Sequence, residues 1–296
     1  MALNYRDFIH PEDEIAIQRL DSVIGFKTIT KLVMNLIKEQ RVRSECLTEM
    51  IRLSPTQLPK IYNLLPPICQ KFGITVPEFY LQSGDCNAYT YGDDQNAIIV
   101  IKSGLLNQLK DEKAISAVLA HECGHIFCRH TFYKTVANYI ANSANLLPLG
   151  QVALGPIQLA LAYWSRRSEL SADRAALIYS GDSESVIRYL IVFAGGSAAI
   201  TKYVNMEEFA AQAELAQKIH SGILQKSLDI STNIIQRSHP FPSERVYEIL
   251  KWEKSEQYQR LRAVLNDQPF EKSCQHCNQT IQIQAKFCRF CGQPQS

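Results

Sequence analysis

The sequence predicts an α+β fold: a helix-rich body that contains a small antiparallel sheet and is followed by a short cysteine-rich module. Three observations lead to this prediction. Apolar residues recur at three- and four-residue intervals over residues 12–72, and again from Ser103 to about Leu265, which is the spacing of a helix with one buried face. Between these stretches lie short segments rich in β-branched and aromatic residues. Four of the nine cysteines lie within residues 274–291.

The bulk composition excludes some classes of protein. With 296 residues, 46% hydrophobic and 20% charged, the chain is long enough to bury a substantial core. Its 31 basic and 29 acidic residues give a net charge of +2 without a basic run, so we expect no nucleic-acid partner. The N-terminus does not have the continuous apolar segment of a secretory signal. We therefore expect a cytoplasmic protein whose cysteines are free thiols or metal ligands.

The elements and domains follow in chain order. Residues 1–60 are predicted to form an N-terminal helical region, and residues 61–265 the central domain. Within that domain, the segments ITVPEFYLQ, NAYTY and NAIIVIK are predicted strands, because Gly84–Asp85 and Gly92–Asp93 separate them as turns. The polar stretch LNDQPFEKS leads into a third predicted unit, the cysteine-rich module of residues 270–296.

Two capping residues mark helix boundaries in the second half of the chain. Asp111 directly precedes a long helical pattern, and an aspartate at this position can accept hydrogen bonds from the free N–H groups of the first turn. Gly181 follows a second helical pattern, where glycine tolerates the left-handed conformation that ends a helix. We therefore expect one helix to begin after Asp111 and another to end before Gly181.

The stretch from Thr135 to Ser165 has no charged residue, and its second half is strongly apolar. A membrane-spanning helix needs about 20 consecutive, mostly apolar residues, whereas prolines and glycines interrupt this stretch. We therefore expect two short helices around a Pro/Gly elbow, buried or lying against an apolar surface. A hairpin that dips into a membrane is the alternative, so that membrane association through residues 135–164 stays open.

The stretch AVLAHECGHIFCRH contains the pattern H-E-x-x-H, formed by His121, Glu122 and His125. Two histidines four residues apart lie on one face of a helix, so both rings can reach the same ion. Glu122 is offset by about 100° around the helix, which places its carboxylate beside a metal, where it can accept a proton from water. The same pattern also arises by chance, so the surrounding sequence must decide.

A catalytic zinc site needs a third protein ligand and one open coordination position. Downstream, the predicted helix RRSELSADRAALIYSG has Glu169 and Asp173 four residues apart, hence on one face. Glu169 can supply the third ligand, and Asp173 can hold a ligand histidine by its other ring nitrogen. Alternatively, these carboxylates form surface ion pairs with Arg166 or Arg174.

The C-terminal stretch CQHCNQTIQIQAKFCRFCGQ has the spacing C-x2-C-x10-C-x2-C. Four thiolates in two such knuckles make a closed tetrahedral zinc site, and a module this small cannot build a core without its metal. We expect Asn278 and Gly292, which follow the two pairs, to turn with positive φ. Two disulfides are the alternative. The predicted zinc ribbon would bind its structural metal through Cys274, Cys277, Cys288 and Cys291.

Three blocks of the sequence resemble one gluzincin family, which contains the HtpX heat-shock proteases and the CAAX prenyl proteases. The block CNAYTYGDDQNAIIVIKSGLLNQLKDEKAISAVLAHECGH resembles the strands and active-site helix of that family. ELSAD resembles its third-ligand helix, and SHPFPSERV its downstream His-Pro segment. The blocks follow the family's order and cover roughly residues 60–250. The resemblance implies a zincin-like metallopeptidase domain over residues 61–265.

The resemblance also implies roles for single residues. A catalytic zinc would be bound by His121, His125 and Glu169, with Asp173 supporting a ligand histidine. Zinc would polarise the scissile carbonyl and activate a water, whose proton Glu122 would take as general base. With the ribbon, the chain would bind two Zn²⁺ ions, one catalytic and one structural.

Substrate contacts are implied in the same way. The edge strand around Asn87, Ala88 and Tyr89 would pair with the substrate backbone, an arrangement that accepts an extended peptide whatever its side chains. His239 aligns with a family histidine near the site, where an imidazole can stabilise the oxyanion. Alternatively, His239 caps a loop before Pro240.

Taken together, these patterns predict a zinc metalloendopeptidase that cleaves unfolded or exposed polypeptide. One alternative is a catalytically silent or gated zinc-binding scaffold, which docks protein partners through its helical body and ribbon. Another is a zinc hydrolase of small amides, which would need a closed pocket. Membrane members of the family have clear spanning helices, whereas this sequence has at most one interrupted hairpin. Cleavage of prenylated proteins inside a membrane chamber therefore does not carry over.

Overall fold

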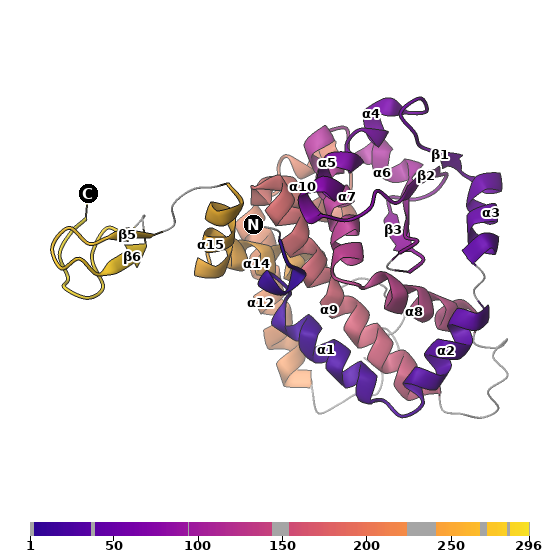
Figure 1. Ribbon diagram of the computed structural model, residues 1–296, viewed down its shortest axis with the longest axis horizontal. Helices are drawn as coiled ribbons and strands as arrows, with labels where there is room; N and C mark the ends of the chain where they lie inside the picture. The colour runs from indigo at the N-terminus through magenta and orange to yellow at the C-terminus, as the bar shows by residue number, and fades with distance from the viewer. Residues whose placement is uncertain are drawn as a thin grey trace.

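The computed structural model describes residues 3–36, 39–93, 95–143, 154–223, 241–266, 271–282 and 285–295. These residues form a helical body with a four-stranded sheet on one side, and a separate two-stranded hairpin (Figure 1). The hairpin lies beyond the last helix of the body, on the side away from the sheet (Figure 1). The predicted helix-rich α+β class is confirmed.

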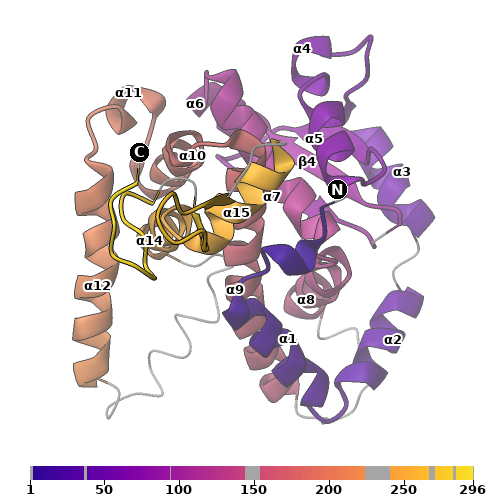
Figure 2. The same cartoon turned by 60° about the vertical axis from the view of Figure 1, so that its left-hand side comes forward.

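Two helices, α7 (Glu112–Phe127) and α9 (Leu154–Ser180), pack against each other inside the body (Figures 1 and 2). They approach closely because the facing residues are small. A Cβ atom added to Gly124 would lie 2.7 Å from Cβ of Ala175 and 3.2 Å from Cα of Ala172. Carbon atoms do not pack this closely, so a larger residue at position 124 would push the two helices apart. This close crossing brings the two segments with the predicted metal ligands together.

The ends of these helices follow the predicted caps. The Asp111 carboxylate accepts a hydrogen bond of 3.2 Å from the backbone N–H of Lys113, which stabilises the first turn of α7. α9 ends at Ser180, and Gly181 follows it with a φ of +75°, a left-handed conformation that costs glycine little.

The N-terminal helices share a core with the centre of the body. α1 (Pro11–Ser22) lies along α9, and α2 (Phe26–Leu36) lies against α8 (Thr131–Ser143) (Figure 1). Their apolar faces meet those of α8 and of the first half of α9. The resulting cluster consists of Ala16, Leu20, Phe26, Ile29, Val33, Val136, Ile140, Ile157, Leu161 and Trp164.

This cluster accounts for much of the apolar character of residues 135–164. Helices form before and after the predicted elbow, since α8 ends at Ser143 and α9 begins at Leu154. Contrary to the expectation, the second helix is not short but continues to Ser180 and includes Gly155 and Pro156 in its first turn. Residues 144–153, between the two helices, lie outside the described residues. Across the described ranges, no helix combines the length and the apolar character that are required to cross a membrane.

The sheet has the strand order β1 (Ile51–Arg52), β2 (Glu78–Gln82), β4 (Ile98–Lys102), β3 (Ala88–Tyr91). β3 and β4 pair in antiparallel fashion, as expected, but β2 and β4 are parallel. The prediction of a wholly antiparallel sheet is therefore wrong for this pair. The chain passes from β2 to the far edge to form β3, then returns through β4 between them. Residue alternation identifies the strands but does not encode this order.

The other helices surround this framework, and α12 (Met206–Ile223) lies on the flank beyond α14 (Pro242–Glu253) (Figure 2). The largest apolar cluster fills the space between one face of the sheet, α7 and the helices that follow it. The remaining described helices are α3 (Glu39–Glu49), α4 (Pro59–Tyr62), α5 (Leu65–Phe72), α6 (Ser103–Gln108), α10 (Ser183–Gly195), α11 (Ala198–Thr201), α12 (Met206–Ile223), α14 (Pro242–Glu253) and α15 (Glu256–Leu265), with a 3-10 turn over Tyr5–Asp7.

Candidate metal centre

Three predicted ligands converge where α7 crosses α9. His121 and His125 lie one turn apart on α7, and Glu169 faces them from α9. Nε2 of each histidine lies 3.3 Å from a carboxylate oxygen of Glu169, that of His121 from Oε2 and that of His125 from Oε1. Two ligand atoms at about 2.0–2.1 Å from one tetrahedral zinc ion are about 3.3–3.4 Å apart. The donor atoms of the three residues all lie within 4.8 Å of one another, so the residues fit a zinc ion.

Burial separates these carboxylates from solvent. Glu169 is 0% exposed and Asp173 is 1% exposed, which rules out the alternative of surface ion pairs. Arg174 instead donates hydrogen bonds to the backbone carbonyl oxygens of Phe8 and Ile9, both at 3.1 Å. A buried carboxylate needs a compensating cation or hydrogen-bond donors, and both carboxylates obtain these inside the site.

Asp173 holds His121 on the side opposite Nε2. Its Oδ1 lies 2.9 Å from His121 Nδ1, so a histidine bound to metal through Nε2 can donate its Nδ1–H to this carboxylate. Arg245 of α14 donates two hydrogen bonds to the same carboxylate, from Nε to Oδ2 at 2.7 Å and from Nη2 to Oδ1 at 2.6 Å. The Tyr189 hydroxyl of α10 donates to Oδ1 at 2.7 Å. The carboxylate on α9 is thus bound to residues of three other helices.

The pKa of His121 and the pKa of His125 are shifted in opposite directions. Burial alone would raise the pKa of Asp173, but Arg245 and His121 outweigh burial and lower that pKa to about 2. Burial tends to lower the pKa of His121, but its hydrogen bonds to Asp173 and Glu169 prevail and raise it. In His125, burial and the nearby Lys134 ammonium together hold the pKa well below the ordinary value. His125 is therefore neutral, the form in which an imidazole binds metal.

Glu122 is buried beside the ligands, but its carboxylate is not one of the converging donors. Its Oε2 accepts a hydrogen bond of 2.6 Å from the hydroxyl of Thr90, which is also buried. Thr90 lies on β3, so this contact joins α7 to the edge strand of the sheet. Thr90 was not among the predicted site residues, although strand alternation places its side chain on the same face as that of Ala88.

Two further residues behind His125 were also missed. Nδ1 of His125 lies 3.0 Å from Nδ1 of His130, and Nε2 of His130 lies 3.0 Å from Oδ2 of Asp13. His130 follows α7 closely and belongs to the same quoted stretch as the H-E-x-x-H motif, so its proximity could have been anticipated. Asp13 lies on α1, and no sequence pattern connects it with the motif.

Lys134 reaches the ligand atoms themselves. Its Nζ lies 2.6 Å from Oε1 of Glu169 and 2.9 Å from Nε2 of His125. Lys134 lies on α8, one turn after His130, with a side chain 19% exposed. A positive charge at this place neutralises the buried Glu169 carboxylate and competes for the atoms that fit a zinc ion.

The predicted substrate strand lies at the edge of the sheet. β3 contains Ala88 and Tyr89, and Asn87 directly precedes it. Among the described strands, β3 pairs with β4 alone. Tyr89 points to the face opposite Thr90, where its hydroxyl donates a hydrogen bond of 3.1 Å to Oε1 of Gln82. The face of β3 that carries Thr90 therefore adjoins the Glu122 carboxylate.

His239 falls within residues 224–240, which are outside the described residues, so its place near the site stays a prediction. The chain is described again from Phe241, and α14 begins at Pro242. Arg245, in the first turn of α14, has Nη1 at 3.3 Å from Oε2 of Glu169. The chain has thus returned to the metal centre within a few residues of His239.

The C-terminal module brings its four cysteines together. It consists of β5 (Glu271–Ser273) and β6 (Thr280–Gln282), paired in antiparallel fashion, and the two knuckles. Sγ atoms lie 3.7 Å apart in one pair and 3.6 Å in another, near the edge of about 3.8 Å for a tetrahedral zinc with bonds of about 2.3 Å. A disulfide would need about 2.05 Å. Asn278 and Gly292 have φ of 57° and 72°, as expected. The pairs are Cys274 with Cys291 and Cys277 with Cys288.

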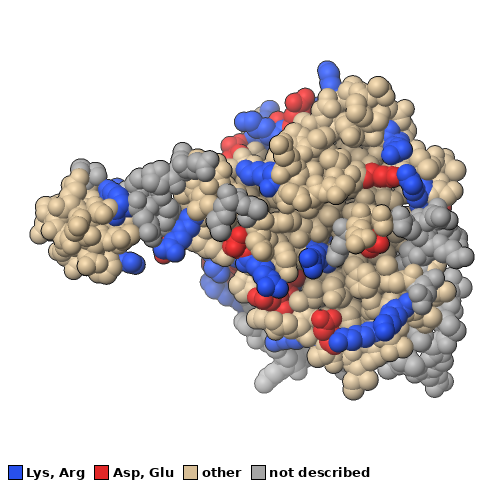
Figure 3. Space-filling view, in the orientation of Figure 1, with Lys and Arg blue, Asp and Glu red and all other residues tan. Residues whose placement is uncertain are grey.

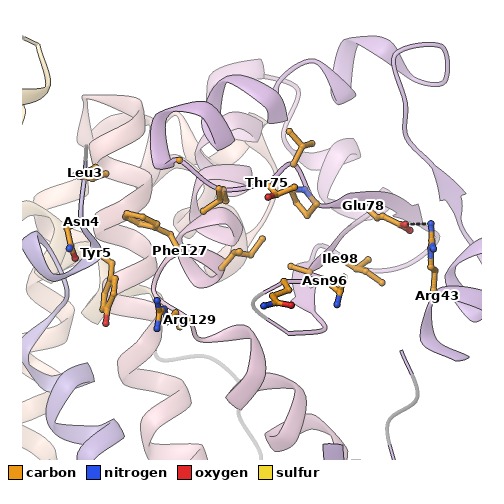
Figure 4. A pocket seen from close by; sticks show the side chains of 17 residues that line it. Leu3, Asn4, Tyr5, Arg43, Thr75, Glu78, Asn96, Ile98, Phe127 and Arg129 are labelled. Atoms are coloured by element: carbon orange, nitrogen blue, oxygen red, sulfur yellow. Dashed lines mark ion pairs between the residues drawn. The ribbon is translucent and has the colours of Figure 1, made fainter. Parts of the chain in front are cut away.

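A wide cleft among the described residues lies away from the converging ligands. A cavity of about 890 Å³ lies between the N-terminal segment, the starts of β2 and β4, and the end of α7 (Figure 4). Arg43 and Glu78 form an ion pair of 2.6 Å on its wall (Figure 4). None of its lining residues among the described ones is a predicted ligand, base or substrate contact.

The profile of peptidase family M48 matches residues 60–253, a stretch that contains α7, α9 and α14 and therefore all three converging ligands. The chain belongs to peptidase family M48. The plastoglobule-localized metallopeptidase 48 of Arabidopsis thaliana chloroplasts is 32% identical over 262 residues, which cover 88% of this chain and 76% of that protein. A protease HtpX homolog from Trichormus variabilis is 29% identical over 171 residues, 47% of this chain and 58% of its own length. A protease HtpX homolog from Ralstonia pickettii is 23% identical over 232 residues, which cover 70% of this chain and 78% of that protein.

Membership confirms the resemblance to the HtpX-like proteases and the enzyme class. This M48 peptidase is a zinc-dependent metallopeptidase, a hydrolase of peptide bonds. The elements outside the matched stretch include α1, which contributes Asp13, and the C-terminal cysteine module. The family profile therefore does not account for either of them.

Proposed function

We propose that this M48 peptidase is an endopeptidase that hydrolyses peptide bonds in unfolded or exposed polypeptides. His121, His125 and Glu169 bind the catalytic zinc, and Glu122 acts as general base. The main support is the convergence of two Nε2 atoms and one carboxylate with the 3.3 Å spacings that a tetrahedral ion requires. Asp173 supports the assignment, because it binds His121 at the nitrogen that a zinc ligand leaves free.

The residues of the chain then have distinct tasks. A zinc ion held by the three ligands supplies Lewis acidity, which polarises a carbonyl group and brings the pKa of water toward neutrality. Glu122 takes the proton of the attacking water and returns it to the leaving amine. Thr90 holds Oε2 of Glu122 at 2.6 Å, which leaves Oε1 for the water. His239 stabilises the oxyanion that develops on the substrate.

The substrate binds in extended form along β3. Its backbone adds to the edge strand around Asn87, Ala88 and Tyr89 by main-chain hydrogen bonds, which select for an unfolded segment rather than for particular side chains. The contact between Thr90 and Glu122 supports this placement, because it sets the general base next to the same strand. A small amide would not need such an edge.

The cysteine module binds the second, structural zinc and contacts protein rather than nucleic acid. Basic and acidic side chains are interspersed on the face shown in Figure 3, which suits a polypeptide substrate of mixed charge.

The protein acts in the cytoplasm, with peripheral membrane contact through residues 135–164. The described part of this segment exposes Leu159 at 46% relative accessibility, and an exposed apolar side chain supports such a contact.

The test compares metal content and casein hydrolysis in the wild type and in Glu122→Gln. We expect two zinc ions per chain in both proteins, and a fall in hydrolysis by about two to four orders of magnitude in the variant, because the base is lost while the ligands remain. His121→Ala should lose one zinc. Full hydrolysis by Glu122→Gln would refute the assignment of the base. One zinc per chain that survives His121→Ala would refute the catalytic site.

A further inference from the structure

A second histidine, His130, contacts His125 at Nδ1, the ring nitrogen opposite Nε2. Its Nδ1 lies 3.0 Å from Nδ1 of His130, and both rings are buried, at 0% and 1% exposure. An imidazole that binds metal through Nε2 carries its proton on Nδ1. Nδ1 of His130 must then accept this hydrogen bond, which places the proton of His130 on Nε2. The geometry thus specifies the tautomers of both rings.

The proton of His130 in turn meets a carboxylate. Nε2 of His130 lies 3.0 Å from Oδ2 of Asp13, which is 1% exposed. The same oxygen accepts a hydrogen bond of 2.6 Å from the hydroxyl of Ser171 on α9. Every step of this chain therefore has a donor facing an acceptor: His125 to His130, then His130 and Ser171 to Asp13.

Further contacts hold α1 in the position at which Asp13 meets His130. The Ser171 hydroxyl accepts a hydrogen bond of 3.0 Å from the backbone N–H of His10, the residue that caps α1. The Trp164 ring packs edge-on against His130 at a centroid distance of 5.7 Å. α9 thus contributes both a metal ligand, Glu169, and the groups that seat α1 and His130.

We propose that Asp13 and His130 are positioning residues of the metal centre, which fix the ring of His125 and make α1 a required part of the site. This inference rests on the proposed zinc site of His121, His125 and Glu169. It extends that site beyond the family's matched stretch of residues 60–253. His121 has its carboxylate directly, in Asp173. His125 is connected to the carboxylate of Asp13 through the ring of His130.

The test measures the affinity of the full-length chain for Co²⁺ and Zn²⁺. Cobalt absorption distinguishes the histidine–carboxylate site from the thiolate site, so each can be titrated in the same protein. Asp13→Leu and His130→Phe keep the size of the side chain but remove its polar atoms. We expect both to weaken metal binding at the histidine site about 10- to 100-fold, while the thiolate site is unchanged.

Two matched variants separate positioning from general packing. Asp13→Asn keeps an acceptor oxygen for His130 and Ser171, so it should recover most of the affinity lost in Asp13→Leu. Glu14→Gln changes an exposed carboxylate of the same helix and should bind as the wild type does. Binding by Asp13→Leu within about twofold of the wild type, or no recovery in Asp13→Asn, would overturn the proposal.

A measurement on the wild type keeps the proposal testable if a variant does not fold. In the zinc-loaded protein, ¹⁵N spectra of the imidazole rings should show His125 protonated at Nδ1 and His130 at Nε2. A proton on Nδ1 of His130 would refute the proposal while leaving the zinc site intact. Wild-type protein that binds no metal outside the cysteine module would instead refute the zinc site, and this inference with it.

Discussion

Single residues decide how strongly the centre attracts a metal, and Lys134 opposes that attraction. Its ammonium lies 2.6 Å from Glu169 and 2.9 Å from His125, where it lowers the pKa of His125 together with burial. A neutral His125 favours metal binding, whereas the positive charge of the Lys134 ammonium repels the metal cation. At an effective dielectric constant of about 20, two unit charges about 4 Å apart interact by about 4 kcal/mol. Repulsion is therefore the larger effect once a divalent ion is bound.

We expect Lys134→Met, which keeps the length of the side chain without its charge, to bind zinc at the histidine site about tenfold more tightly. Partial relief of the repulsion suffices for this change, since a factor of ten corresponds to about 1.4 kcal/mol. Competition with a chromophoric chelator measures the affinity. Lys134→Arg keeps the charge and should stay close to the wild type. Weaker binding by Lys134→Met would show that the ammonium assists the metal site.

The sequence could predict the residues of this centre only where local geometry links them. Spacing on one helix brings His121 and His125 together, and the same argument places Glu169 and Asp173 on one face. Asp13 is different, because its partner His130 lies far along the chain and no periodicity relates α1 to the loop after α7. Such a pair follows from tertiary packing, and a single sequence holds no signal for it.

Among the elements, β3 connects the sheet with the chemistry. Its Thr90 donates a hydrogen bond of 2.6 Å to Oε2 of Glu122, and both side chains are buried. A hydrogen bond to a charged group contributes about 1.5–3 kcal/mol. This contact orients the carboxylate that we propose as the base, so the edge strand positions the base and, in our proposal, the substrate as well.

Thr90→Val replaces the hydroxyl by a methyl group of similar size. We expect its kcat for casein hydrolysis to fall about tenfold, with zinc content and KM unchanged, because the base loses its orientation but the ligands and the outer edge of the strand do not change. Thr90→Ser keeps the hydroxyl and should retain most of the activity. A rise in KM at unchanged kcat would contradict this account, because it would assign Thr90 to substrate binding alone.

The order of the strands was harder to predict than their existence. Alternating residues indicated β3 and β4, and the Gly92–Asp93 turn between them suits the antiparallel pair that forms. The parallel pairing of β2 with β4 depends on which edge the chain reaches after Gln82. No local pattern records that choice. Consequently β3, the proposed substrate strand, is at the edge of the sheet for a topological reason.

At the scale of the whole molecule, the chain has cores of unequal size. The body contains one large apolar cluster along each half of α9, whereas the buried apolar residues in the described part of the C-terminal module are Cys274, Ile281 and Cys288. Burial of three side chains cannot offset the entropy of ordering such a module. The four convergent thiols indicate that metal supplies the missing stability there.

The double substitution Cys274→Ser/Cys288→Ser removes two ligands from the module. We expect zinc content to fall from two ions to one per chain, and limited proteolysis to cleave within residues 271–295. The thermal unfolding of the body should change little, since its clusters share no residue with the module. His276→Gln, which alters an exposed side chain of the module and keeps all four thiols, is the matched control and should retain both zinc ions. A large decrease in the melting temperature of the body would contradict this independence, because it would mean that the folded module contributes to the stability of the peptidase itself.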